Sequence, residues 1–266
     1  MYPDCPTMND TPEIYPLARD KAESSRLVRN MLDRYGKVLK KPPRLNAQHK
    51  FLIDVVDCLI DSAIPLDNIS TVADVGTGTG IWLVEARDFL NTKRFSPDRY
   101  FHGFDISSAQ FPLSLPAGIG FSVQDILNPF PVEHHNRYDL VYVRMLVTAI
   151  RNTEYRDAVK NLLTILKPGG FLQWVELDCS ALPNSKNSQN PRSAVIISSW
   201  LKFFQLNGLS EYAPSIIEDA YERSGMMDII NTSFSLDRRG EDLKAKAQKW
   251  QMQAFPAATV PIYAKN

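Results

Sequence analysis

The 266-residue chain predicts an α/β fold in which a mostly parallel, doubly wound sheet follows a set of N-terminal helices. Strand patterns alternate with helical patterns between residues 71 and 178. These strand patterns are almost continuously apolar, as expected for parallel strands covered on both faces. A glycine-rich turn, "VADVGTGTGIWLVEA" (72–86), joins the first strand pattern to a helix.

The elements follow in order along the chain. Residues 1–16 are expected to form an irregular arm, and helices are expected over 18–39 and over 46–64, with Asn46 as N-cap. Strands are predicted at 71–76, 99–107, 119–126, 137–146 (running into a helix) and 171–178, with helices at 81–90, 154–170 (closed by a glycine turn) and 194–209. A sixth strand is expected at 227–236. A seventh at 258–266 is interrupted by Pro261.

Composition restricts the classes of partner and the compartment. Thirty basic residues balance thirty acidic ones, which argues against a nucleic-acid or anionic-membrane partner. The three cysteines form no CxxC pair, so neither a disulfide framework nor structural zinc is expected, and a reducing, cytoplasmic environment fits best. The N-terminus lacks a secretory signal pattern, and the apolar runs are too short to span a bilayer.

The glycine turn indicates a cofactor site, although a flexible turn is the alternative. Gly76, Gly78 and Gly80 stand at every second position, with Asp74 two residues ahead of the first. A dinucleotide fingerprint G-x-G-x-x-G requires glycine where Ile81 stands, and no G-K-[ST] of a Walker loop follows. The pattern is therefore D-x-G-x-G-x-G, at the turn where open parallel sheets bind ligands.

This pattern closely resembles motif I of class I S-adenosylmethionine-dependent methyltransferases. The resemblance implies a Rossmann-like fold and S-adenosyl-L-methionine as cofactor, with the glycines under its amino-acid part and Asp74 near its ammonium group. Asp105 and Asp125 match the second and third strand ends of that family, where the side chains bind the ribose hydroxyls and the adenine amine. Each aspartate alone could equally be a cap or turn residue. The implied cofactor-binding residues are Asp74, Gly76, Thr77, Gly78, Gly80, Asp105, Ile106, Asp125, Ile126 and Gln48.

Longer stretches resemble the LaeA-like methyltransferase group of fungi. The matching segments are "ESSRL", "RLNAQHKFL", "DVGTGTGIW", "RYDLVYVRML" and "LKPGGFLQWVELD", spread over residues 13–180. That group contains natural-product methyltransferases, regulators of secondary metabolism and cofactor-binding pericyclic catalysts. The resemblance places Arg44, Gln48 and His49 on a helix that closes over the cofactor.

Candidate catalytic residues are fewer. Methyl transfer mainly requires alignment, and a general base is needed only when the acceptor must lose a proton. His49 and Arg144 are the candidates. Arg144 lies at the carboxyl end of the fourth strand, where it could bind a substrate carboxylate or form a salt bridge within the fold. His134 and His135 are expected in a surface loop, and no metal site is predicted.

Two parts of the chain are expected: N-terminal helices covering the active site (1–66) and a cofactor-binding domain (67–266). Within the second, residues 182–212 could form a lid or substrate segment with Trp200, Phe203, Phe204 and Leu206, or simply pack as an amphipathic helix. The predicted activity is methyl transfer to oxygen or nitrogen of a small natural-product molecule. A pericyclase or cyclase and a non-catalytic regulator are the alternatives. The weak seventh strand leaves a sheet edge exposed, which predicts a homodimer.

Overall fold

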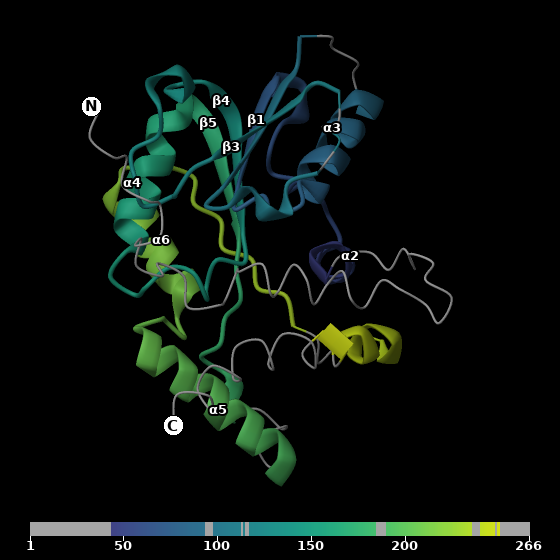
Figure 1. Ribbon diagram of the computed structural model, residues 1–266, viewed down its shortest axis with the longest axis vertical. Helices are drawn as coiled ribbons and strands as arrows, with labels where there is room; N and C mark the ends of the chain where they lie inside the picture. Colours follow the sequence, from purple (N-terminus) through teal and green to yellow (C-terminus); the bar gives the residue numbers. More distant parts are fainter. Residues whose placement is uncertain are drawn as a thin grey trace, which may run out of the picture.

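A computed structural model describes residues 44–93, 98–112, 114, 117–184, 190–235, 240–247 and 249–250. At its centre lies a five-stranded sheet in the order β3-β2-β1-β4-β5, with every neighbouring pair parallel (Figure 1). The strands are β1 (Thr71–Val75), β2 (Tyr100–Asp105), β3 (Ile119–Val123), β4 (Tyr138–Arg144) and β5 (Leu166–Val175). This order confirms the predicted doubly wound fold. It places the topological switch point between β1 and β4, where the strand order reverses and where such sheets form a ligand crevice.

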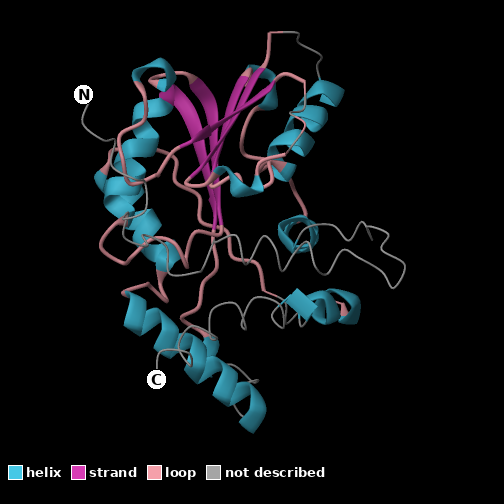
Figure 2. Ribbon diagram, viewed as in Figure 1, coloured by secondary structure: helices cyan, strands magenta, loops and turns pink. Residues whose placement is uncertain are grey.

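Helices cover both faces of the sheet (Figure 2). Helix α3 lies against β1 and β2 on one face, while α4 packs on β5 and on α6 on the other. The helices are α2 (Arg44–Val56), α3 (Ile81–Lys93), α4 (Tyr155–Ile165), α5 (Pro191–Asn207) and α6 (Ala213–Arg223). Short 3-10 turns lie at Leu66–Asn68, Ser108–Gln110, Val132–His134 and Leu182–Asn184. None of the described helices is long and apolar enough to cross a membrane.

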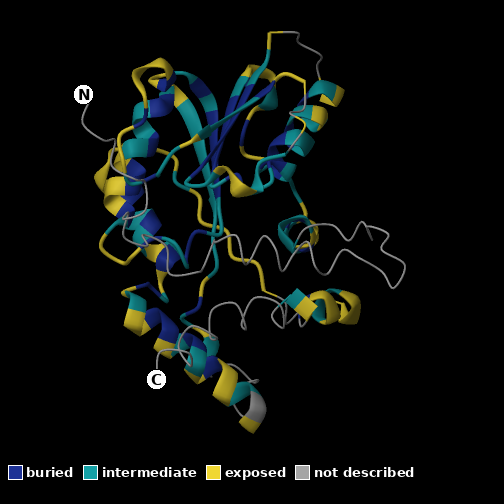
Figure 3. Cartoon of the chain, in the orientation of Figure 1, coloured by how far each residue is buried: buried dark blue, intermediate teal, exposed yellow. Residues whose placement is uncertain are grey.

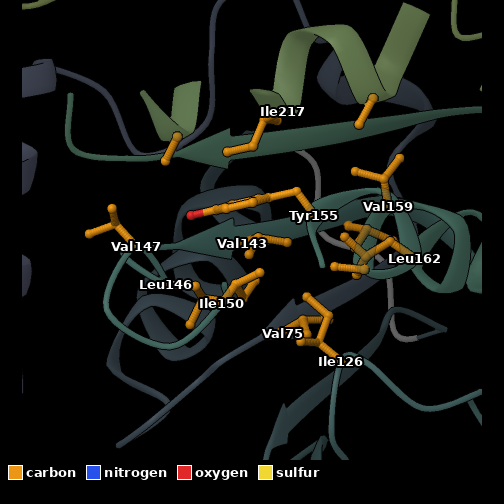
Figure 4. Close-up of a cluster of buried hydrophobic side chains, with 14 of the residues drawn as sticks. Val75, Ile126, Val143, Leu146, Val147, Ile150, Tyr155, Val159, Leu162 and Ile217 are labelled. Atoms are coloured by element: carbon orange, nitrogen blue, oxygen red, sulfur yellow. The ribbon is translucent and has the colours of Figure 1, made fainter. Parts of the chain in front are cut away.

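The apolar patterns of the sequence become two cores, one on each face of the sheet. The larger core lies between the sheet and α4, α5 and α6, and includes Tyr155, Val159 and Leu162 from the amphipathic face of α4 (Figure 4). The smaller core lies under α3, where the indole of Trp82 stacks on the ring of Tyr142 with 3.7 Å between ring centroids. Buried residues accordingly concentrate along the strands and the inner helix faces (Figure 3).

Helix α2 packs beside the helical residues 241–247, which come from far along the chain (Figure 1). Lys246 Nζ lies 2.9 Å from Asp54 Oδ2, and the rings of Phe51 and Trp250 stack at 5.7 Å. The C-terminal part of the described chain therefore supports α2.

The second predicted helix is wrong at both of its ends. It already includes Arg44, so Asn46 lies inside the helix and is not its N-cap. It ends at Val56 and not near Pro65, because Asp57 has a positive φ of 61° that a continuing α-helix does not allow.

Two later elements also differ from the prediction. Helix α4 ends at Ile165 and β5 begins at once, so the expected glycine turn lies inside the strand, where Gly169 has φ 75° and the pairing with β4 shifts register. The sixth strand expected at 227–236 is absent over 227–235, which carry no strand assignment. The predicted arm at 1–16, the helix at 18–39 and the strand at 258–266 lie outside the described residues.

Helix α5 occupies most of residues 182–212, the segment that could form either a lid or an ordinary amphipathic helix. Trp200, Phe203 and Phe204 are buried and belong to the larger core, whereas Leu206 is 63% exposed. The three aromatic rings are thus packed as in an ordinary amphipathic helix.

Candidate functional site

The glycine turn connects β1 to α3 in a conformation that suits its three glycines. Gly76, Gly78 and Gly80 have φ values of 75°, 56° and 73°, a region that residues with a Cβ atom rarely adopt. The backbone N–H groups of Gly76 and Thr77 donate to the carbonyl oxygen of Phe104 at 2.8 and 2.9 Å. The turn is therefore held against the end of β2.

Two buried aspartates hold this turn by accepting hydrogen bonds from it. Asp74 Oδ2 accepts a 2.6 Å hydrogen bond from Thr77 Oγ1, and Asp105 Oδ2 accepts one of 2.9 Å from the backbone N–H of Gly78. Both residues are 3% exposed. Burial raises the pKa of Asp74 to about 6, although the Thr77 hydrogen bond and the nearby positive charge of Arg144 act in the opposite direction.

The third predicted carboxylate, Asp125, follows β3. Its Oδ1 accepts from the backbone N–H of Leu127 at 2.9 Å, and Ile126 between them is 9% exposed. Asp125 is thus a turn residue, as the simpler interpretation expects, and also lines a pocket at the carboxyl ends of the strands.

That pocket brings together the predicted strand-end residues. It encloses about 500 Å³, including the solvent at its mouth. Its lining is Val75, Gly76, Asp105, Ile106, Gln124, Asp125, Ile126, Leu127, Leu146, Ala149 and Ile150. The apolar wall is continuous with the larger core, where Val75, Ile126, Leu146 and Ile150 lie (Figure 4). A largely apolar pocket with two aspartates in its lining suits a flat ring that carries hydroxyl and amine donors.

Glu176, which the sequence interpretation missed, fixes the chain that leaves β4. Its Oε2 accepts from the backbone N–H of Leu146 at 2.8 Å and from the indole N–H of Trp174 at 3.2 Å, while Oε1 accepts from the N–H of Leu177. Burial raises its pKa to about 7. Met145, just before Leu146, has φ 55°, an uncommon value for a residue with a side chain. Glu176 therefore holds a strained turn that supplies three residues of the pocket wall.

Helix α2 lies over the glycine turn. Thr79 Oγ1 donates a 2.7 Å hydrogen bond to Asn46 Oδ1, and Leu45 Cδ1 is 2.9 Å from where a Cβ on Gly78 would stand. Gln48 is half-buried on the same helix but does not line the pocket. Arg44, Gln48 and His49 therefore lie on one helix, while its closure over the cofactor and the role expected for Gln48 stay predictions.

His49 and Arg144, predicted separately, are in direct contact. Arg144 Nη1 lies 2.8 Å from His49 Nδ1, and His49 Nε2 lies 2.8 Å from Glu85 Oε2. A guanidinium can only donate, so Nδ1 is the acceptor and Nε2 carries the hydrogen that is donated to Glu85. Burial lowers the pKa of His49, whose side chain is fully buried, so the ring is neutral near pH 7. Because both ring nitrogens are occupied, His49 is not poised to act as a general base in this arrangement.

Sequence reasoning also missed Glu85, because a charged residue on a helix surface carries no distinguishing pattern.

The expectation that His134 lies in a surface loop was wrong. It is 6% exposed, its Nδ1 lies 2.7 Å from Tyr138 Oη, and its ring packs on His102 and Phe104. His135 is exposed, as expected. The described residues contain no cluster of side chains able to hold a metal ion.

The chain is similar in sequence to several known proteins. A family model described as "Methyltransferase domain" matches residues 26–257. The chain is 41% identical over 138 residues to methyltransferase grgD of a Penicillium species, covering 51% of this chain and 48% of the relative. It is 27% identical to N-methyltransferase gliN of Aspergillus fumigatus, covering 66% of this chain and 67% of the relative. It is also 26% identical to the secondary metabolism regulator LAE1 of Hypocrea atroviridis, covering 70% of this chain and 50% of the relative.

Among solved structures, the plantazolicin methyltransferase BpumL is 17% identical with a TM-score of 0.49, covering 77% of this chain and 83% of that one. The chain spans about half the length of most of the curated relatives it matches.

Proposed function

Because this chain belongs to the methyltransferase-domain family and its cofactor is S-adenosylmethionine, we propose that it methylates an oxygen or nitrogen atom of a small natural-product molecule. The observation that carries the proposal is the pocket at the carboxyl ends of β1 to β3, with Asp105 and Asp125 in its lining and the glycine turn beside it. Three of the relatives are named N-methyltransferases, which favours nitrogen as the acceptor atom.

The residues present fit this cofactor. The carboxylate of Asp105 accepts hydrogen bonds from the backbone N–H groups of Gly78 and Ser107 at 2.9 and 3.2 Å. A carboxylate can accept several hydrogen bonds at once, so the same group suits hydroxyl donors. Ile126 and Ile150 form an apolar wall for a ring, and Asp125 offers a carboxylate beside it. When bound, S-adenosylmethionine supplies an electrophilic methyl group.

The chain's own contribution is alignment and exclusion of water. The glycine turn is fixed by its hydrogen bonds to β2, and α2 covers it through the Asn46–Thr79 contact. Holding two reactants in line can lower a barrier by about 7–11 kcal/mol at best, so no conspicuous base is needed when the acceptor is a neutral amine. A phenol or acid acceptor would need one, and His49 could serve only after Arg144 had moved from Nδ1.

The decisive experiment compares metabolites of the source organism with the gene present and deleted, followed by incubation of the purified protein with the accumulating compound and S-adenosylmethionine. A methylated product formed with an equimolar amount of S-adenosylhomocysteine supports the proposal. Isomerisation without consumption of the cofactor would indicate a pericyclase or cyclase. Cofactor binding with no turnover and only protein partners would indicate a regulator.

We further propose that the protein acts in the cytoplasm as a homodimer and binds no nucleic acid. The balanced charge supports the last point, and β5 is the outermost strand of the described sheet, with no partner among the described residues on its far side. Exposed apolar side chains on α5, Val195, Ile196 and Leu206, offer further surface for a second copy. Light scattering at micromolar concentration tests the dimer, and a particle of about one chain mass would contradict it.

A further inference from the structure

The guanidinium of Arg144 is held in an unusual environment. It is half-buried beside the glycine turn, because Val143 pairs with Val75 and the two strands therefore end side by side. Its hydrogen-bond partner among the described residues is His49 Nδ1, and its central carbon lies over the Tyr142 ring, 5.8 Å from the ring centroid. No carboxylate of the described chain forms an ion pair with it.

A half-buried cation whose hydrogen-bond partner is neutral keeps part of its positive charge uncompensated. Asp74 interacts with the guanidinium through charge alone, and its carboxylate accepts its hydrogen bond from Thr77. His49 uses one of the five N–H groups of this arginine, on Nη1, which leaves a fork of donors. Such a fork matches a carboxylate in charge and in planar geometry.

The Glu85–His49 pair explains how the guanidinium is kept in place. Glu85 accepts the Nε2 hydrogen of His49 and so fixes the ring tautomer in which Nδ1 is a lone-pair acceptor. A neutral imidazole can hold an arginine by one hydrogen bond without neutralising it. An aspartate or glutamate at this position would have compensated the charge.

We infer that Arg144, positioned by Glu85 through His49, is a carboxylate-binding group at the edge of the glycine turn. The inference rests on the proposed function in so far as the carboxylate belongs to a ligand of that site. Two ligands could supply it: the amino-acid part of the cofactor, or the molecule that is methylated. Arg144 is the binding residue, and Glu85 and His49 are positioning residues.

The test measures by calorimetry how wild type and Arg144→Met bind two probes, S-adenosylhomocysteine and 5′-methylthioadenosine, which shares the adenosine but lacks the amino acid. If the cofactor supplies the carboxylate, the variant binds S-adenosylhomocysteine about tenfold to a hundredfold more weakly and methylthioadenosine as wild type does. If the substrate supplies the carboxylate, the variant binds both nucleosides as tightly as wild type does. In that case its affinity for benzoate, a simple carboxylate probe added to the S-adenosylhomocysteine-loaded protein, is lower than that of wild type. Lys50→Met, an exposed cation next to His49, is the control and changes none of these affinities.

Rescue by a conservative variant separates positioning from a merely structural role. His49→Asn keeps an acceptor near Nδ1, whereas His49→Leu removes it. We expect the leucine variant to reproduce the selective loss of Arg144→Met, and the asparagine variant to recover most of it. Equal weakening of both nucleosides, or no change in any of the three affinities, would overturn the inference. If the wild type binds neither nucleoside, the proposed function fails, and benzoate binding by the free protein still decides the role of Arg144.

Discussion

At the scale of single residues, Asp105 combines a structural and a ligand-facing position. Its carboxylate accepts the N–H of Gly78 at 2.9 Å and lines the pocket between β1 and β3. Because an aspartate side chain is acceptor-only when ionised, one group can hold the turn and still face hydroxyl donors. The strand-end position made this residue predictable from sequence, whereas its bond to Gly78 was not, since that bond depends on how the turn folds back over β2.

We expect Asp105→Ala to weaken binding of S-adenosylhomocysteine about tenfold to a hundredfold, because a charged hydrogen bond contributes about 1.5–3 kcal/mol. Titration calorimetry measures the change, and thermal unfolding shows how far the turn itself is destabilised. Asp67→Ala removes an exposed carboxylate from the turn before β1 and is the matched control. An affinity equal to that of wild type would mean that Asp105 does not face the ligand.

At the scale of elements, α2 acts as a cover on the glycine turn. The helix is tied to the turn by Asn46 and Thr79, to α3 by His49 and Glu85, and to residues 241–247 by Asp54 and Lys246. These ties come from three different parts of the chain. The position of α2 is therefore set by tertiary contacts and not by its own helix propensity.

Asn46→Ala should loosen this cover. Loss of the 2.7 Å bond from Thr79 costs about 0.5–1.5 kcal/mol, so we expect faster amide hydrogen exchange in α2 and a roughly twofold to tenfold weaker affinity for S-adenosylhomocysteine. Lys50→Ala, an exposed change on the same helix, should leave both unchanged. Unaltered exchange in the Asn46 variant would show that the other ties suffice.

Periodicity predicted the five strands, α3 and α4, because each buries an apolar face against the sheet. It failed after Val56, where Ile60 and Ile64 are buried in the smaller core without forming a helix, so the same apolar spacing was satisfied by an irregular segment. It failed again at 227–235, where Met227, Ile230 and Phe234 are exposed and no neighbouring strand pairs with them among the described residues. Local pattern cannot show whether a partner strand is present.

At the scale of the whole molecule, a buried polar network joins β2, β3 and β4. His102 contacts Tyr100 Oη through Nδ1 at 2.8 Å and Ser122 Oγ through Nε2 at 2.9 Å. The centroids of the His134 and His102 rings lie 4.7 Å apart, and His134 Nδ1 is hydrogen-bonded to Tyr138 Oη. Sequence reasoning missed this network because the loop "PVEHHNRYD" is polar, and only its packing on β2 and β4 buries it.

Burial lowers the pKa of His102 from 6.5 to about 4, and the neighbouring charge of His134 acts in the same direction. Between these values the unfolded chain binds more protons than the folded one, so the free energy of unfolding decreases as pH falls from about 6.5 to about 4. At about 1.4 kcal/mol per pKa unit, this contribution reaches about 3 kcal/mol. Asp74 and Glu176, whose pKa values are raised, act in the opposite sense, so a comparison of variants is needed.

His102→Gln keeps a neutral hydrogen-bonding side chain and removes this titration. We therefore expect it to be less stable than wild type at pH 7, because Gln cannot reproduce both ring contacts, and to lose less stability on acidification. Urea unfolding at a series of pH values from 7 to 4.5 gives both curves, and their difference isolates His102 because Asp74 and Glu176 are present in each. His135→Gln, at the exposed neighbour of His134, is the matched control. If the curve of His102→Gln ran parallel to that of wild type, the pKa of His102 would be the same in the folded and unfolded states, which would contradict the prediction.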